Sequence, residues 1–105
     1  MYNIKTNFDK IFEVLKEITG DETDAKGNYL RRGTRPRFSD LEVIALSLTA
    51  ECLGIDSKNY LFSKLTKDNV NDFDNLISRR QYNDRRKLLF EKTEQVRKLM
   101  AARLN

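Results

Sequence analysis

Apolar residues near the start of the chain recur at intervals of three and four positions. These residues are Ile4, Phe8, Ile11, Phe12, Leu15 and Ile18. Such spacing places the side chains on one face of a helix. Asn7 is a residue type that caps the starts of helices, and Gly20 is one that ends them. The pattern therefore predicts a helix over about residues 7–19.

A second helix is predicted over residues 39–53, where the segment DLEVIALSLTAECL is apolar on most sides. Ser39 and Glu42 have the spacing of a capping box, in which each side chain accepts a hydrogen bond from the other residue's backbone amide. Pro36 disfavours helix upstream of this box, and Gly54 marks the end of the helix. Because the segment lacks a polar face, we expect this helix at the centre of the fold.

Two more helices are predicted, over about residues 57–65 and 78–103. Ser57 caps the first of them, and Ser78 with Gln81 forms a second capping box at the start of the other. The expected apolar contacts of the shorter helix are Tyr60, Leu61 and Leu65.

Steps of about 100° per residue divide the last helix into two faces. One face carries Tyr82, Leu89, Val96, Leu99 and Met100. The opposite face carries Arg79, Arg80, Asn83, Arg86 and Lys87. Phe90 falls toward the polar face, which indicates either a bend in the helix or a second contact surface.

Residues 20–37 connect the first two helices and are polar and punctuated by glycine. Their composition offers little to bury, so we expect a flexible loop. No segment alternates polar and apolar residues as a strand does. The predicted fold is therefore all-α: a single domain over residues 1–105, built as a small bundle of four to five helices, with a helix-turn-helix-like arrangement and a long basic C-terminal helix.

Positive charge is concentrated in two short stretches. Residues 31–37, RRGTRPR, hold four arginines and no acid, and residues 78–87, SRRQYNDRRK, hold five cations against Asp84. Together the stretches sum to +8, whereas the whole chain carries +4, so the remainder is acidic. A near-neutral body with two cationic patches is typical of proteins that bind phosphate backbones. The aromatic neighbours of the patches, Phe38 and Tyr82, are expected in the core.

Composition excludes several functions. The chain has no histidine and one cysteine, Cys52, which removes structural zinc and the catalytic triads built on histidine, and we expect no cofactor. Cys52 lies in an apolar stretch and is expected to be a buried thiol in a reducing cytoplasm. No apolar run has the length of a membrane span, and the start, MYNIKTNFDK, lacks the apolar core of a signal peptide. A cytoplasmic protein without a membrane partner is predicted.

The basic face of the last helix suits the major groove of double-stranded DNA. Arginine can bind guanine through two hydrogen bonds, and Asn83 or Gln81 can pair with adenine. The first basic stretch can act as an arm along the minor groove or the backbone. Its arginines are Arg31, Arg32, Arg35 and Arg37. Both stretches also have a simpler interpretation as solvated surface, and this alternative stays open.

Three blocks of sequence carry a family resemblance. The first, within RPRFSDLEV, includes Pro36, Phe38, Ser39, Asp40 and Glu42. The second is Gly54, Ile55, Asp56 and Ser57, and the third, within SRRQYNDRR, includes Ser78, Arg79, Gln81, Tyr82, Asn83 and Arg85. Taken in order, the blocks resemble the amino-terminal region of DDE-type transposases from bacterial insertion sequences. The resemblance covers roughly residues 30–100.

The resemblance implies a helical domain that binds the terminal inverted repeats of a transposon during DNA transposition. In that family the metal-binding catalytic acids lie in a strand-rich core of the RNase H type, and none is carried over to this chain. The chain is accordingly expected to be an excised domain or a truncated element, and not an enzyme by itself. Two alternatives stay open. One is an assembly module that forms a homodimer without touching DNA, and the other is a free-standing regulator of the repressor or antitoxin kind. The assembly module would pair through Leu89, Val96, Leu99 and Met100.

Overall fold

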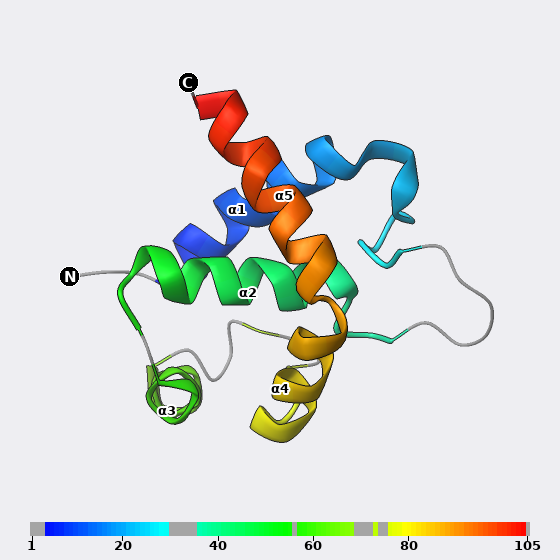
Figure 1. Ribbon diagram of the computed structural model, residues 1–105. Helices are drawn as coiled ribbons and strands as arrows, with labels where there is room; N and C mark the ends of the chain where they lie inside the picture. Colours follow the sequence, from blue (N-terminus) through cyan, green and yellow to red (C-terminus); the bar gives the residue numbers. More distant parts are fainter. Residues whose placement is uncertain (1–3, 30–35, 56, 69–72, 74–75, 105) are drawn as a thin grey trace.

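The computed structural model describes residues 4–29, 36–55, 57–68, 73 and 76–104 (Figure 1). Within these ranges the chain forms five α-helices and one short 3₁₀ turn, and it forms no strand. The helices are α1 (Ile4–Thr19), α2 (Asp40–Cys52), α3 (Lys58–Asp68), α4 (Arg79–Leu88) and α5 (Phe90–Leu104), and the 3₁₀ turn is Gly20–Glu22. The prediction of an all-α helical bundle is confirmed.

α2 forms the centre of the bundle, as its apolar sequence predicts. All of its residues from Val43 to Ala50 are buried. Helices α1 and α4 both pack against α2, while α3 packs against α4 and α5 packs against α1 (Figure 1). The largest buried side chains include Leu15, Phe38, Leu41, Ile44, Leu46, Leu61, Leu65 and Tyr82. The two aromatic residues beside the basic stretches, Phe38 and Tyr82, therefore belong to the core, as expected.

Both ends of α2 agree with the sequence prediction. The backbone amide of Ser39 donates to Glu42 Oε1 over 2.8 Å, and the amide of Glu42 donates to Ser39 Oγ over 3.2 Å. This is the predicted capping box. After the helix, Gly54 adopts a φ of 72°, a left-handed conformation that favours glycine and ends many helices.

α1 begins about one turn earlier than the sequence predicts. Ile4 and Phe8 are both buried against α2, so the apolar stripe extends the helix toward the start of the chain. Lys5 and Asp9, one turn apart, form an ion pair at 2.9 Å that supports the added turn. Asn7 lies inside the helix, so its assignment as the capping residue was wrong.

The predicted flexible loop over residues 20–37 needs correction for residues 20–29, which form an ordered turn. Asp24 Oδ1 accepts hydrogen bonds from the backbone amides of Lys26 and Asn28, both at 3.0 Å. Gly27 takes a φ of 97° and donates its amide to the Asp24 carbonyl at 3.0 Å. Composition alone missed this turn because hydrogen bonds to one aspartate, and not apolar burial, hold it.

Asn28 fastens this turn to the start of α2. The side chain is buried, and its Nδ2 donates to the Pro36 carbonyl at 2.9 Å. Its Oδ1 accepts the backbone amide of Asp40, also at 2.9 Å. The carbonyl of Gly27 accepts the amide of Leu41 at 2.9 Å. The two ends of the connection between α1 and α2 are therefore held beside each other.

The single long helix predicted over residues 78–103 is two helices. α4 ends at Leu88 and α5 begins at Phe90, and the amide of Leu89 closes α4 by donating to the Arg85 carbonyl at 2.9 Å. The break allows α4 to pack on α2 and α3 while α5 reaches α1. Of the two alternatives predicted for Phe90, the bend is confirmed. The side chain is 61% exposed, and a second contact surface stays a prediction.

Two smaller expectations also change. Cys52 is exposed, and its predicted burial was wrong, because the buried run of α2 ends at Ala50. Tyr60, predicted as an apolar contact of α3, is also exposed, whereas its neighbour Phe62 is buried. Five residues join α2 to α3 and ten join α3 to α4. Both connections are longer than the three or four residues that join the helices of a helix-turn-helix. They do not support the helix-turn-helix-like arrangement, which stays a prediction.

In the part of the chain that the structure describes, no helix combines the length and the apolar character needed to cross a bilayer.

Candidate nucleic-acid interface

α4 starts at the surface with its predicted cap in place. The amide of Gln81 donates to Ser78 Oγ at 3.2 Å, and the amide of Ser78 donates to Gln81 Oε1 at 3.2 Å. Ser78 and the first turn of α4 are exposed. The capping box fixes where α4 begins, and therefore which side chains face outward.

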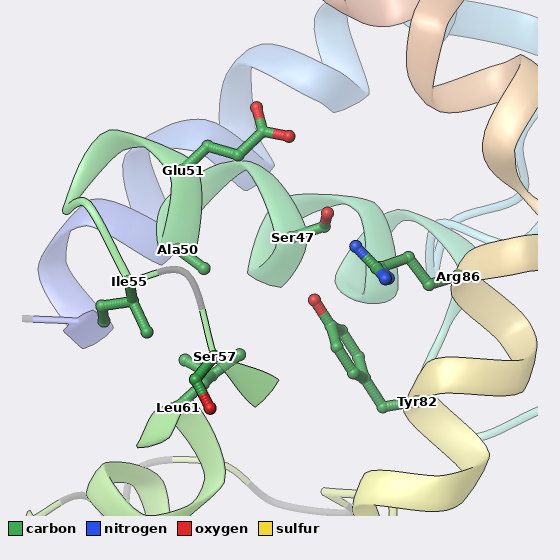
Figure 2. Close-up of a pocket in the computed structure, with 8 residues that line it drawn as sticks. All are labelled: Ser47, Ala50, Glu51, Ile55, Ser57, Leu61, Tyr82 and Arg86. Atoms are coloured by element: carbon green, nitrogen blue, oxygen red, sulfur yellow. The ribbon is translucent and has the colours of Figure 1, made fainter. Parts of the chain in front are cut away.

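The inward face of α4 is anchored by Tyr82. Its side chain is 2% exposed and packs against Phe62 of α3, with the ring centroids 5.3 Å apart. Burial raises the pKa of the Tyr82 hydroxyl, while a hydrogen bond with Ser47 and the charge of Arg86 act in the opposite direction. Figure 2 shows the hydroxyl pointing from α4 toward Ser47 on α2.

A buried ion pair joins α4 to the start of α2. Arg85 Nη2 lies 2.9 Å from Asp40 Oδ1, and the side chains of this pair are 18% and 2% exposed. Arg85 Nη1 also donates to the Phe38 carbonyl. Since Phe38 directly follows Arg37, this pair holds the end of the first basic stretch against the helix that carries the second.

The other oxygen of Asp40 holds the far end of the same connection. Asp40 Oδ2 accepts the backbone amide of Tyr29 at 3.0 Å. Lys92 of α5 places its ammonium 4.9 Å from the centre of the Tyr29 ring. Burial raises the pKa of Tyr29 to about 12, with smaller contributions from the charges of Glu22 and Asp40. Asp40 thus organises the residues on both sides of the first basic stretch.

The outward face of α4 carries four of the five contact residues predicted for this helix. Arg79, Arg80 and Lys87 are exposed, and Asn83 is half-buried. These four positions fall within a sector of about 100° on the helix. Asp84, also exposed, lies next to this sector. A helix with three cations and an amide on one exposed face can contact phosphates and base edges together.

Arg86 departs from the predicted arrangement. The side chain is half-buried and turns toward α2, where Figure 2 shows its guanidinium facing the hydroxyl groups of Ser47 and Tyr82. It lines two adjoining cavities of about 150 and 180 Å³. Arg86 is therefore separated from the outward face on which the sequence placed it.

The first basic stretch is only partly described. Arg37 is exposed and lines a surface hollow of about 370 Å³ together with Lys26 and Pro36. The predicted contact residues Arg31, Arg32 and Arg35 lie outside the described residues. Sequence reasoning missed Lys26, because it precedes the stretch and becomes its neighbour only through the turn at Gly27.

Arg85 was assigned only to the basic charge and to the third block of the family resemblance, so its structural role was also missed. A signal was present in the sequence, because steps of 100° place Arg85 near Tyr82 and away from the basic face. Its partner, Asp40, lies 45 positions earlier in the chain, and no local pattern links the two.

Neither metal-ligating groups nor similarity to known proteins gives a further indication of function. Among the described residues, no group of three or more metal-ligating side chains comes together. Comparisons of this chain with protein-family models, with curated proteins and with solved structures gave no match.

Proposed function

We propose that this chain is a DNA-binding domain of a DDE-type transposase and that it recognises the terminal inverted repeats of a bacterial insertion sequence. The observation that carries the proposal is the ion pair between Arg85 and Asp40, at 2.9 Å. With the hydrogen bond from Arg85 to the Phe38 carbonyl, it holds the residue after the first cationic stretch against α4, which carries the second. Arg37 and the basic face of α4 can therefore belong to one DNA-binding surface, although the two stretches lie more than forty residues apart in the sequence.

The geometry supports different contacts with DNA for α4 and for the first basic stretch. α4 enters the major groove, where Arg79, Arg80 and Asn83 reach base edges. Arg37 and Lys87 contact the phosphate backbone and set the orientation of the helix. Arg31, Arg32 and Arg35 complete the arm.

The family assignment rests on the resemblance of the three sequence blocks. In the proposed protein this domain binds the ends of the element, and a separate catalytic domain cuts and joins DNA. The domain itself acts without a cofactor.

Recognition of a specific sequence is tested by fluorescence anisotropy. A labelled duplex that carries the terminal repeat of the element is compared with a scrambled duplex at one salt concentration. We expect at least a tenfold preference for the repeat, which is modest among specific DNA-binding proteins. Asn83→Ala should reduce this preference, and the exposed amide Gln95 on α5 supplies a matched control. Equal affinity for both duplexes contradicts end recognition.

A second function is favoured by the junction of α4 and α5, where Leu88 is 84% and Phe90 is 61% exposed. Such a pair suits a contact with a second copy of the chain. The stripe first predicted for that contact is largely used inside the fold, because Val96 is buried and Leu89 and Met100 pack on the core. Leu99 alone of the four is exposed.

Homodimer formation is tested by sedimentation equilibrium over a range of concentrations. The double variant Leu88→Ser, Phe90→Ser should be monomeric wherever the native chain is a dimer. Tyr60→Ser, an exposed aromatic change on α3, is the control. A native chain that stays monomeric at every concentration excludes this function.

A further inference from the structure

Two adjoining cavities lie beside the proposed DNA-binding face, the first between α2, α3 and α4 and the second between α2, α4 and α5. Their volumes are about 150 and 180 Å³, and both are lined by Ser47, Glu51 and Arg86. The first continues toward Tyr82 (Figure 2), and the second opens between the exposed residues Lys87 and Phe90. Each volume is several times the roughly 30 Å³ that one water molecule takes in the liquid.

Arg86 brings an unsatisfied hydrogen-bond donor to this place. Among the described residues, its Nε is the one buried side-chain nitrogen or oxygen without a hydrogen-bond partner. Buried polar groups in folded proteins are almost always paired, and an unpaired charged donor is especially costly. An unpaired donor at the wall of a cavity therefore points to a ligand that supplies the acceptor.

The acids that line the cavities, Glu51 and Glu94, share one cationic partner. Arg97 lies 2.5 Å from Glu51 Oε1 and also pairs with Glu94. With Arg86 and Lys87, three cations line the second cavity against these two carboxylates, which gives a net charge of +1. The ligand that the cavity favours is consequently an anion.

The donors are arranged on more than one side of the space. The guanidinium of Arg86 can offer Nε–H and one terminal N–H along a single edge. The hydroxyl groups of Ser47 and Tyr82, which share one hydrogen bond, face the guanidinium (Figure 2). The proton of one hydroxyl group forms this hydrogen bond, so the proton of the other hydroxyl group can point into the cavity. Donors on two sides fit a tetrahedral anion with three acceptor oxygens better than a planar carboxylate.

We propose that the space at Ser47 and Arg86, where the two cavities adjoin, binds a phosphate group, held by the guanidinium edge of Arg86 and approached past Lys87. Arg86 is thus a phosphate anchor, and it does not read bases. The site itself is independent of the DNA-binding function, but the assignment of the phosphate to a nucleic-acid backbone rests on that proposed function. A backbone phosphate seated there would fix the depth of α4 in the groove.

The test follows the Nε–Hε resonance of Arg86 by NMR in the full chain, assigned by its loss in Arg86→Lys. Inorganic phosphate is titrated at constant ionic strength against chloride, and a DNA duplex is titrated separately. We expect a saturable downfield shift of this resonance with phosphate, while the Nε–Hε resonance of the exposed Arg80 stays in place. The duplex should produce the same shift.

The phosphate titration and the duplex titration distinguish a failure of the phosphate site from a failure of the DNA-binding function. If anisotropy detects duplex binding but neither phosphate nor the duplex moves the Arg86 resonance, the phosphate site is refuted and DNA binding stands. If phosphate shifts the resonance and no duplex binds, the phosphate site stands and the DNA-binding function is refuted. If phosphate shifts Arg86 and Arg80 equally, binding is nonspecific and the site is refuted.

A matched pair of variants provides an affinity measurement. Arg86→Lys keeps the charge but removes the two-donor edge, and it should weaken duplex binding about tenfold, as loss of one charge-assisted contact does. Arg80→Lys makes the same change on the exposed face. If both variants fold, as shown by circular dichroism, and Arg86→Lys binds duplex as tightly as the native chain, the anchor role is wrong.

Discussion

Removal of the Arg85 guanidinium tests the connection on which the interface depends. In Arg85→Met the side chain keeps its length and loses its charge. Asp40, whose side chain is 2% exposed, would then be a buried carboxylate without its cation, and the Phe38 carbonyl would lose a donor. Asp40 would keep the hydrogen bond from the amide of Tyr29 at 3.0 Å and its position in the first turn of α2.

The expected loss of stability follows from these contacts. Breaking a buried ion pair by removing one partner costs about 3–5 kcal/mol. The lower end applies here, because the Arg85 side chain is 18% exposed and water can enter. The N-terminus of α2 also favours the remaining negative charge, by about 0.5 kcal/mol. We therefore expect a loss of about 3 kcal/mol, or roughly 10–20 °C in Tm for a domain of this size.

The assay is urea and thermal unfolding followed by circular dichroism at the helical band. Asp40→Asn and the double variant complete a mutant cycle, and we expect a coupling energy of at least about 1.5 kcal/mol. Arg80→Met, on the exposed face, should change stability by less than about 0.5 kcal/mol. A loss below about 1 kcal/mol in Arg85→Met, or a coupling energy near zero, would refute the role given to this pair.

Three further predictions concern the elements around the interface. Gly27→Ala should lower stability by about 2 kcal/mol in urea unfolding, because φ is +97° and the new Cβ would meet Ser39 Oγ at 3.0 Å and Leu41 Cβ at 3.1 Å; an unchanged midpoint would contradict the close approach. Tyr29 keeps its proton to a higher pH in the folded state, where its pKa is about 12. The stability gained by burying the neutral hydroxyl group is therefore complete below pH 10 and is lost between pH 10 and 12. NMR of the Tyr29 ring carbon should give that late midpoint, and a midpoint near 10 would contradict its burial. Ser78→Ala removes the cap of α4 and should cost about 1 kcal/mol, measured by thermal unfolding, with a change of less than about 0.5 kcal/mol expected for the exposed Gln95→Ala.

Local patterns were sufficient to predict most of the fold. The capping boxes at Ser39 and Ser78 are hydrogen-bond motifs that span three residues, so the sequence shows them directly. The central place of α2 followed from its lack of a polar face. The break at Leu89 was harder to predict from the sequence, because a regular apolar stripe continues through it. Only packing against different neighbours, α2 and α3 on one side and α1 on the other, explains why the helix divides there.

The candidate site was less accessible to sequence reasoning. The exposed positions Arg79, Arg80 and Lys87 could be assigned to one face by helical geometry alone. Arg86 could not, because its direction depends on a cavity formed with Ser47 of another helix. The same holds for Arg85, whose partner is distant in the sequence. Long-range polar contacts leave no periodic signal, and they decide which cations of a basic helix are free to meet a ligand.

The central claim is that the outward face of α4 binds the phosphates and bases of double-stranded DNA. Its most direct test is the salt dependence of duplex binding by anisotropy, for the native chain and two charge-matched double variants. If about six cations neutralise phosphates, the native slope of log K against log salt should be about −5, and it should be less steep by about 2 in Arg79→Ala, Lys87→Ala. The control, Lys10→Ala with Lys98→Ala, removes two exposed charges from α1 and α5 and should keep the native slope. Equal slopes for the two variants, or a native slope near zero, would contradict the claim.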